Sequence, residues 1–282
     1  MFVVGSAGQL WVDDDRLAAT TTGSVPVLLL APADMPGVFW PAPLLEWFDE
    51  RGVAAVRYDQ RDTGRSDVAA QEYSLRDLAA DAVAVLDALE IERAHAMGLS
   101  MGGMVAQVLA LDFPERVHSL TLVATTPGLG DPRLPGPAGH IVQELAKRIY
   151  AGPPTEPDEL VDWLLAGRRL FAGPRFAHRD GELPDQVRAI VAAGWRAETG
   201  HGAAVVNSAS RLDRLGEISV PTTVVHGTAD NVFTVEHGLA LADGISGAEL
   251  ILIEGMGHEF PAELIESFVA SLERLLSATS GK

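Results

Sequence analysis

The sequence contains no cysteine among its 282 residues. Disulfide bonds, thiolate nucleophiles and zinc sites built from cysteine are therefore excluded. Lysine is also scarce, since it occurs only at Lys147 and Lys282 while the other basic residues are arginine. No apolar run reaches the length of about 18 residues that a membrane-spanning helix needs, so no membrane contact is expected. Met1–Ala7 lacks a basic segment, which argues against a secretory signal and predicts a cytoplasmic protein.

Acidic residues outnumber basic ones and give a formal net charge of −18 at pH 7. A surface of this charge repels nucleic-acid phosphates and anionic lipids, so neither is expected as a partner. We interpret the charge as a source of solubility rather than as a binding surface. The hydrophobic fraction of 47% is typical of a globular chain that buries a sizeable core.

Short apolar runs alternate with longer helical patterns, which predicts a mainly parallel sheet flanked by helices, the α/β fold class. The continuous apolar run Val25–Ala31 is typical of a strand covered on both faces, and Ser74 is expected to cap a helix. The predicted strands are Val3–Gly5, Leu10–Asp14, Val25–Ala31, Val53–Tyr58, Ala94–Gly98, Ser119–Ala124, Pro221–His226 and Glu249–Ile253. The predicted core helices are Pro43–Arg51, Ser74–Leu89, Met101–Asp112 and Leu264–Leu276.

The alternation of strands and helices stops after Ser119–Ala124. Pro127–Pro137 is rich in proline and glycine and is typical of a linker, and the pattern from His140 to Leu215 is helical. We therefore expect residues 1–126 and 216–282 to form the core and residues 127–215 to form an inserted helical cap. An insert at this position would lie over the carboxyl edge of the sheet, where open α/β sheets bind their ligands.

The strongest chemical signal is the segment Gly98–Gly102, which reads GLSMG and matches G-x-S-x-G between a predicted strand and a predicted helix. The chain must reverse sharply at Ser100, and only glycine fits two residues before and after such a turn. The turn would lift the Ser100 hydroxyl above the sheet edge, where the next helix directs its first N–H groups. The alternative is a glycine-rich turn that only joins strand to helix, and the flanking strand and helix disfavour it.

A serine nucleophile needs an adjacent base, and the base needs a carboxylate to orient it. His258 follows the last predicted strand and is expected at the same sheet edge as Ser100. Asp230 follows the preceding core strand; the alternative is that it only caps the helix near Thr234. We predict Ser100, Asp230 and His258 as a catalytic triad, in the chain order of α/β hydrolases. Activity should fall on acidification, because His258 must be neutral to accept a proton.

Several segments resemble the α/β-hydrolase superfamily and, more narrowly, the aclacinomycin methylesterase group. The resemblance covers about residues 24–125 and 217–277 and is weak across the insert. It implies an α/β-hydrolase fold and hydrolysis of a methyl ester on a bulky aromatic, natural-product substrate in antibiotic biosynthesis, with neither cofactor nor metal. The triad carries over onto Ser100, Asp230 and His258. The segments that carry the resemblance are Val25–Leu29, Tyr58–Ser66, Leu78–Asp87, Gly98–Gly102 and Glu254–His258.

A tetrahedral oxyanion needs two backbone N–H donors. One is expected from Met101, directly after the nucleophile, and the other, by position, from Ala33. The superfamily usually has His-Gly before the second donor, whereas this chain has Ala31-Pro32 there and Asp34 after it. Proline has no N–H and fixes its own φ, so the loop should have a different shape. An ionised Asp34 would oppose the developing oxyanion, and we also count it among the candidate substrate-binding residues.

Two rivals to an esterase stay open. The first is an acyltransferase with the same triad, which would move an acyl group from a carrier-protein thioester to an alcohol or amine. The unusual loop Ala31–Asp34 is the one hint in its favour, because a poor oxyanion hole could leave an acyl-enzyme waiting for a non-water acceptor. The second is a binding protein without catalysis, which the complete triad disfavours.

The insert and one core loop supply the remaining candidates. Trp163, Phe171 and Trp195 could form an apolar wall for a small-molecule substrate, although helically spaced apolar residues normally form the segment's own core. The polar loop Asp59–Ser66 could bind phosphate, but we expect turns and ion pairs that brace the neighbouring catalytic loops.

Overall fold

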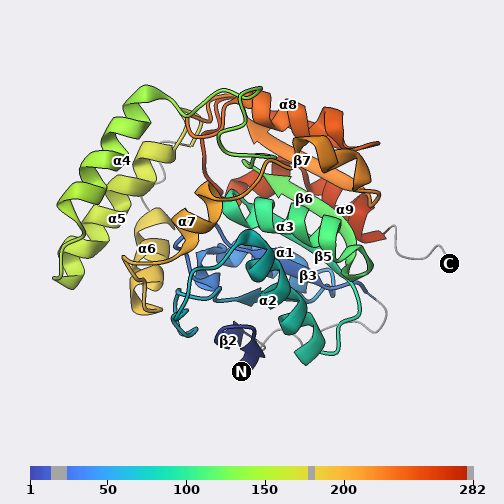
Figure 1. The fold of residues 1–282 in the computed structure, drawn as a ribbon, viewed down its shortest axis with the longest axis horizontal. Helices are drawn as coiled ribbons and strands as arrows, with labels where there is room; N and C mark the ends of the chain where they lie inside the picture. Colours follow the sequence, from blue (N-terminus) through green and yellow to red (C-terminus); the bar gives the residue numbers. More distant parts are fainter. Residues whose placement is uncertain (14–23, 177–181, 278–282) are drawn as a thin grey trace.

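The computed structural model describes residues 1–13, 24–176 and 182–277. An eight-stranded sheet in these ranges has the order β1-β2-β4-β3-β5-β6-β7-β8 (Figure 1). The strands are β1 (Phe2–Gly5), β2 (Gly8–Asp13), β3 (Val27–Leu30), β4 (Ala55–Tyr58), β5 (Ala94–Leu99), β6 (Val117–Val123), β7 (Thr222–Gly227) and β8 (Glu249–Ile253).

The sheet is parallel from β4 to β8, and β1 and β2 add an antiparallel hairpin at its edge. All four residues of β3 are buried, as the unbroken apolar run predicts for a strand with helices on both faces. The predicted α/β class with a mainly parallel sheet is therefore confirmed. Because the parallel strands end at one edge, the loops that follow β3, β5, β7 and β8 meet there.

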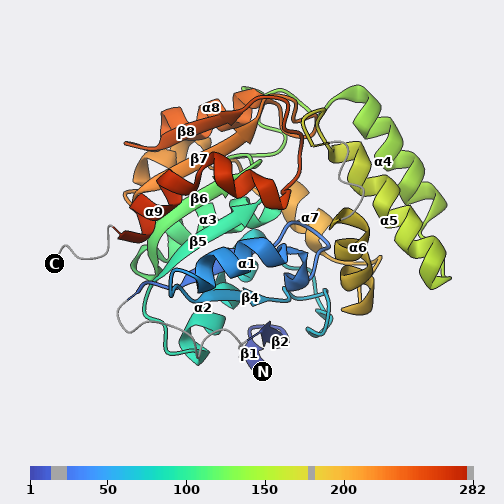
Figure 2. The ribbon, with the colours of Figure 1, turned by 180° about the vertical axis from the view of Figure 1, so that it is seen from behind.

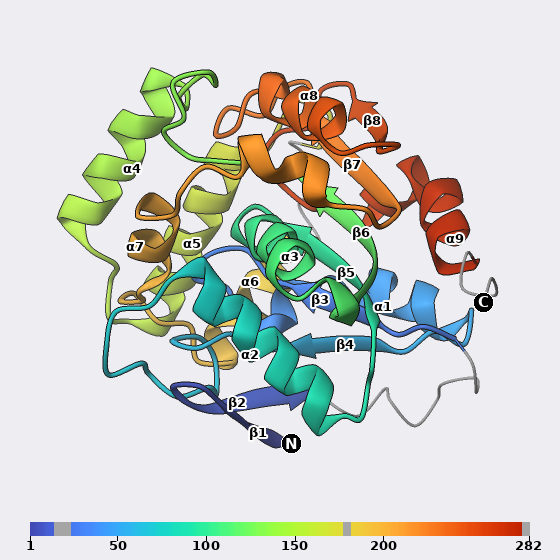
Figure 3. The ribbon, with the colours of Figure 1, turned by 45° about the vertical axis from the view of Figure 1, so that its right-hand side comes forward.

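Five helices flank the sheet in two layers, each with its own hydrophobic cluster. Helices α1 and α9 lie on one face, with Leu44, Phe48 and Leu272 in the cluster beneath them (Figure 2). Helices α2, α3 and α8 lie on the other face, where Leu78 and Leu109 are buried (Figure 3). The five are α1 (Ala42–Asp49), α2 (Leu75–Ala88), α3 (Met101–Asp112), α8 (Val235–Gly244) and α9 (Val269–Ser277).

The start of α2 shows how the sequence sets a helix boundary. The Ser74 hydroxyl accepts a hydrogen bond from the backbone N–H of Asp77, and the Asp77 carboxylate accepts one from the backbone N–H of Ser74 at 2.8 Å. This reciprocal capping box satisfies two N–H groups that the helix leaves without a partner. The predicted N-cap at Ser74 is confirmed.

The last predicted helix, Leu264–Leu276, is wrong as a single element. The structure has a 3₁₀ helix over Ala262–Ser267 and then α9, with Phe268 between them at φ −134° and ψ 12°. Phe268 is buried, and its ring packs edge-on against Phe260 at a centroid distance of 6.4 Å. Apolar residues continue at helical spacing through both pieces, so the pattern hides the break that Phe268 makes.

Helices α4 (Gly139–Ala151), α5 (Pro157–Phe171), α6 (Glu182–Ala192) and α7 (His201–Val206) lie between β6 and β7 in the chain and on one side of the sheet (Figure 1). We refer to residues 127–215 as the insert. Helices α5 and α6 share a small cluster of their own, in which Leu164, Leu165 and Val187 are buried. None of the helices in the described ranges has the length and apolarity that a membrane crossing needs.

Candidate active site

Ser100 occupies a sharp turn between β5 and α3, with φ 55° and ψ −119°. A non-glycine residue in this region carries strain of about 1–3 kcal/mol, which surrounding structure must hold. A Cβ atom added to Gly98 would lie 2.3 Å from the carbonyl carbon of Gly102, and one added to Gly102 would lie 1.9 Å from the carbonyl oxygen of Leu30. Glycine is therefore required two residues before and two residues after Ser100.

The structure brings His258 and Asp230 to the same edge of the sheet as Ser100. Nε2 of His258 lies 2.9 Å from Oγ of Ser100, and Nδ1 of His258 lies 2.8 Å from Oδ2 of Asp230. The other Asp230 oxygen accepts the backbone N–H groups of Val232 and Phe233, both at 2.9 Å. Asp230 thus orders the turn before α8 and also orients the imidazole. Its predicted role as the orienting carboxylate and the alternative role at the start of the helix are therefore compatible.

Electrostatics favour an ionised Asp230. Burial is the largest single influence and raises the pKa of this carboxyl, but its interactions with His258, His226 and the Phe233 N–H together outweigh burial, and the net shift of the pKa is downward. The carboxylate selects the His258 tautomer with the proton on Nδ1, which leaves Nε2 to accept from Ser100. His226 lies 3.7 Å from the same carboxylate, but its Nε2 donates to the Phe233 carbonyl and burial lowers its pKa, so it stays neutral.

Two phenyl rings flank the His258 imidazole. The Phe233 ring lies edge-on at a centroid distance of 5.2 Å, and the Phe171 ring lies edge-on at 6.0 Å. Phe171, a predicted substrate-wall residue, therefore lies beside His258. Phe233 was not predicted; its position three residues after Asp230, in the turn that the carboxylate orders, was the available signal.

The loop that carries His258 is fastened to the end of α5. A Cβ atom on Gly257 would lie 2.2 Å from the Phe171 carbonyl oxygen, and one on Gly173 would lie 2.2 Å from the Gly255 carbonyl oxygen. The buried Glu259 carboxylate accepts the N–H groups of Gly173 at 2.7 Å and Gly257 at 3.3 Å. The backbone of the His258 loop therefore packs directly on the backbone at the end of α5. This contact helps to fix the position of the His258 imidazole.

The two predicted oxyanion donors come from adjacent segments. Met101 is the first residue of α3, and its N–H has no partner within the helix. The close contact of Gly102 with the Leu30 and Ala31 carbonyls brings this helix terminus against the loop that contains Ala33. Asp34, the next residue, has φ 64°, and its carboxylate accepts the hydroxyl of Thr199 from the insert. Asp34 is thus engaged by the chain itself, with 45% of its side chain exposed.

Trp163 and Trp195 belong to the small cluster of the insert. Their ring centroids lie 5.9 Å apart, and the Arg148 guanidinium lies 3.8 Å above the Trp163 ring. Trp195 also packs against the core cluster beneath α1. Of the three predicted wall residues, Phe171 has its ring against His258, whereas Trp163 and Trp195 have their rings against each other.

The loop Asp59–Ser66 forms internal bonds and bonds to its neighbours. Nε2 of Gln60 donates to the Ala31 carbonyl oxygen at 2.9 Å, which ties this loop to the predicted oxyanion loop. Arg61 and Asp81 form a buried ion pair at 2.7 Å. The loop therefore braces the neighbouring segments, as expected from the sequence.

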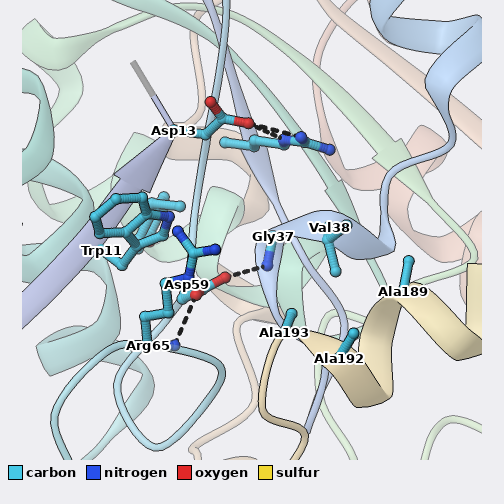
Figure 4. Close-up of a pocket in the computed structure, with 11 residues that line it drawn as sticks. Trp11, Asp13, Gly37, Val38, Asp59, Arg65, Ala189, Ala192 and Ala193 are labelled. Carbon is cyan, nitrogen blue, oxygen red and sulfur yellow. Dashed lines mark hydrogen bonds and ion pairs between the residues drawn. The ribbon is translucent and has the colours of Figure 1, made fainter. Parts of the chain in front are cut away.

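A cavity of about 400 Å³ lies between the core and α6 (Figure 4). Its lining does not include Ser100, Asp230 or His258. The Arg65 guanidinium lies 4.5 Å from the Trp11 ring, and Asp13 forms an ion pair with Arg57 at 2.6 Å. Ala192 and its neighbours in α6 form the opposite wall. We therefore do not assign this cavity to the reaction.

Among the described residues, no group of three or more His, Asp or Glu side chains could hold a metal ion.

A family model of the alpha/beta hydrolase fold matches residues 32–263. The chain belongs to the α/β-hydrolase family. This hydrolase is 30% identical over 269 residues to rhodomycin D methylesterase DauP of Streptomyces sp. (strain C5), with 88% of this chain and 89% of the relative covered. It is also 30% identical over 267 residues to rhodomycin D methylesterase DnrP of Streptomyces peucetius, with the same shares covered. The predicted family and the resemblance to methylesterases are confirmed, and the protein is an ester-hydrolysing enzyme.

Solved structures agree with the fold of this hydrolase. A hydrolase from Pseudomonas aeruginosa PA01 has a TM-score of 0.70 and 26% identity, with 100% of this chain and 98% of that chain covered. Est816, described as an N-acyl homoserine lactone degrading enzyme, has a TM-score of 0.72 and 26% identity, with 99% of each chain covered. The similarity therefore extends through the insert as well as the core.

Proposed function

We propose that this hydrolase cleaves a carboxylic ester through an acyl-enzyme on Ser100. His258 serves as general base and then general acid, and Asp230 holds its imidazole in the required tautomer. The observation that carries the proposal is the unbroken pair of hydrogen bonds from Asp230 through His258 to the Ser100 hydroxyl. This arrangement supplies the nucleophile, base and orienting carboxylate that acyl transfer needs.

In the first step, Oγ of Ser100 attacks the ester carbonyl carbon while Nε2 of His258 takes the hydroxyl proton. The ionised Asp230 stabilises the imidazolium that forms. Collapse of the tetrahedral intermediate breaks the bond to the alcohol oxygen, which leaves with the proton from His258. The acyl group then remains on Ser100.

In the second step, His258 takes a proton from water, and the resulting hydroxide attacks the acyl carbonyl. Collapse of the second intermediate breaks the bond between the acyl carbon and Oγ of Ser100, and His258 returns its proton to Oγ. The carboxylic acid product leaves and ionises to a carboxylate. The N–H groups of Met101 and Ala33 stabilise the oxyanion in both steps. The loss of one such donor typically costs a factor of about 10²–10³ in rate.

For the substrate, we propose the methyl ester of a bulky aromatic natural product, in a pathway of antibiotic biosynthesis. Both relatives named above are rhodomycin D methylesterases and match along most of their length. The apolar edges of Phe171 and Phe233 beside His258 suit a large aromatic group. In this proposal residues 127–215 form a cap over the reaction site, with Phe171 on its inner side.

Stopped-flow release of p-nitrophenolate from a short-chain p-nitrophenyl ester tests the mechanism. We expect sustained turnover in the wild-type enzyme and its loss in Ser100→Ala. A single stoichiometric burst that stalls would instead show that water is a poor acceptor and would favour acyl transfer. Turnover that survives in Ser100→Ala would contradict the assigned nucleophile.

A comparison of methyl esters tests the substrate class. Polycyclic aromatic methyl esters should have a higher kcat/KM than methyl acetate, with the carboxylate product measured by mass spectrometry. Replacement of Phe171 by Ala should reduce the preference, because the ring beside His258 is removed. Equal kcat/KM values for large and small esters would contradict the proposed class while leaving the Ser100 mechanism intact.

A further inference from the structure

A short segment of the insert, Thr199–His201, binds the loop that contains Ala33. The backbone N–H of Asp34 donates to Nδ1 of His201 at 2.9 Å. The Thr199 hydroxyl donates to the Asp34 carboxylate, and the Thr199 oxygen also accepts the His201 backbone N–H. The insert thus grips Asp34 by its backbone and by its side chain.

The gripping segment is itself fixed to the core through Asp62. The Asp62 carboxylate accepts the Gly200 backbone N–H at 2.8 Å and the Tyr73 hydroxyl at 2.6 Å. The Tyr73 ring lies against Gly200, where an added Cβ would come within 2.6 Å of it, and it meets the His201 ring edge-on. The position of His201 is therefore set by the core, and rearrangement of the segment would break several bonds together.

His201 is chemically suited to accept a hydrogen bond at Nδ1. Its side chain is fully buried, and burial lowers its pKa in spite of the nearby Asp34 and Asp62 carboxylates. The imidazole is therefore neutral at neutral pH, with its proton on Nε2 and its lone pair on Nδ1. The Asp34 N–H faces that lone pair.

These bonds restrain the backbone on both sides of Ala33. Asp34 adopts φ 64°, a strained value that persists only where neighbouring bonds hold it. The Asp34 N–H is fixed by His201, and the Ala31 carbonyl is fixed by Gln60 at 2.9 Å. Pro32 restricts φ between these two anchors. Ala33 is thus held on both sides, which provides the pre-organisation that an oxyanion donor requires.

We infer that His201 and Thr199 are positioning residues of the oxyanion hole, which hold the Asp34 peptide so that the Ala33 N–H meets the oxyanion on Ser100. This inference rests on the proposed esterase function. It assigns a function in the reaction to two insert residues that need not touch the substrate. It also explains how a loop with Ala31-Pro32 in place of His-Gly can keep a donor in place.

The test compares variants that keep or remove the acceptor for the Asp34 N–H. His201→Leu removes it, whereas His201→Asn offers Oδ1 at nearly the position of Nδ1. We expect kcat for the p-nitrophenyl ester to fall about 10–100-fold in His201→Leu, with KM little changed, and to recover largely in His201→Asn. Thr199→Val and Thr199→Ser provide an independent pair of the same design, should His201→Leu fail to fold.

A trifluoromethyl ketone supplies a readout that a merely structural role would not change. It adds to Ser100 and places an oxyanion in the hole, so its Ki should rise in parallel with the loss of kcat in His201→Leu and Thr199→Val. Urea unfolding reports any change in stability separately. Unchanged kcat and Ki in folded His201→Leu and Thr199→Val would overturn the inference, as would equal losses in Leu and Asn variants. Turnover that persists in Ser100→Ala would reject the proposed function instead.

Discussion

The backbone N–H of His258 donates a hydrogen bond of 2.8 Å to the carbonyl oxygen of Phe171. His258 follows the last strand of the core, whereas Phe171 ends helix α5 of the insert. The residue that we propose as general base is therefore held at its backbone by the insert and at its side chain by Asp230. The insert therefore contributes to the position of His258.

Gly257→Ala should reduce activity by displacing this backbone contact. The added Cβ would lie 2.2 Å from the Phe171 carbonyl oxygen and 2.4 Å from the Gly173 nitrogen, so the loop must move and carry His258 away from Ser100. We expect kcat to fall about 10–100-fold, since misplacement of reacting groups by about 1 Å can cost 10²-fold. Steady-state hydrolysis of a p-nitrophenyl ester provides the measurement.

Gly139→Ala is the matched control, because nothing lies within 4 Å of a Cβ added at the start of α4. It should keep wild-type kcat. Wild-type activity in Gly257→Ala would show that the contact with Phe171 does not determine where the imidazole lies.

The strain at Ser100 predicts that glycine at this position gives a more stable protein than alanine does. Glycine adopts φ 55° without the steric cost that any other residue carries there. Ser100→Gly should therefore be more stable than Ser100→Ala by about 1 kcal/mol in urea unfolding, although both lose activity. The two variants both lack the hydroxyl and its bond to His258, so their difference isolates the backbone term. Equal stabilities would mean that the strain at this position does not exceed the extra conformational entropy that glycine loses on folding.

The turn at Ser100 was predictable from sequence because its causes are local. Gly98 and Gly102, two residues on either side of Ser100, are needed because a Cβ atom at either position would clash with nearby backbone. The strand before the turn and the helix after it are visible in the apolar pattern. Asp230 and His258 were also within reach, since each follows a parallel strand and such strands end at one edge. Ser74 was identified for the same reason, because a capping box spans only four residues.

The contacts of the insert with the loops that carry Asp34 and His258 were not predictable in this way. Thr199 and His201 meet Asp34 across more than 160 residues of sequence, and a helical pattern does not specify which core loop a helix terminus touches. Asp34 was expected near the oxyanion, but the sequence offered no sign that its carboxylate already has a hydroxyl partner. Tertiary packing decides such contacts, and composition and periodicity do not encode them.

Asp230→Asn should impair catalysis far more than folding. The amide oxygen can still accept the N–H groups of Val232 and Phe233, but the amide nitrogen then donates to Nδ1 of His258. The imidazole proton moves to Nε2, which can no longer accept from Ser100. We expect kcat to fall by about 10⁴, as loss of the orienting carboxylate does in other triads. Asp158→Asn, at an exposed position in the first turn of α5, should leave kcat unchanged. A loss of less than about tenfold in Asp230→Asn would contradict the assigned tautomer.

Buried neutral histidines predict that stability declines in acid. Burial, followed by the charge of His118, lowers the pKa of His95 from 6.5 to about 3. The ring nitrogens of His95 lie 2.6 Å from the Ser119 hydroxyl and 2.9 Å from the Thr121 hydroxyl. Because the folded-state pKa is the lower one, the unfolded chain binds the extra proton between these values. The contribution of His95 is therefore complete above about pH 6.5 and is lost as pH falls toward about 3.

Urea unfolding of wild type and His95→Gln at about pH 7.5 and about pH 5 measures this contribution. One group with this shift should remove about 2 kcal/mol of unfolding free energy over that interval. We expect His95→Gln to be less stable than wild type at the higher pH, since one hydroxyl contact is lost, but to lose about 2 kcal/mol less on acidification. His140→Gln, at an exposed position, is the control and should show the same change in unfolding free energy with pH as wild type.

His201, His226 and His237 have pKa values lowered mainly by burial. The stability of His95→Gln should therefore still decline in acid, but less steeply than that of wild type. An unchanged dependence of the unfolding free energy on pH would show that His95 binds its proton equally well in the folded enzyme and in the unfolded chain.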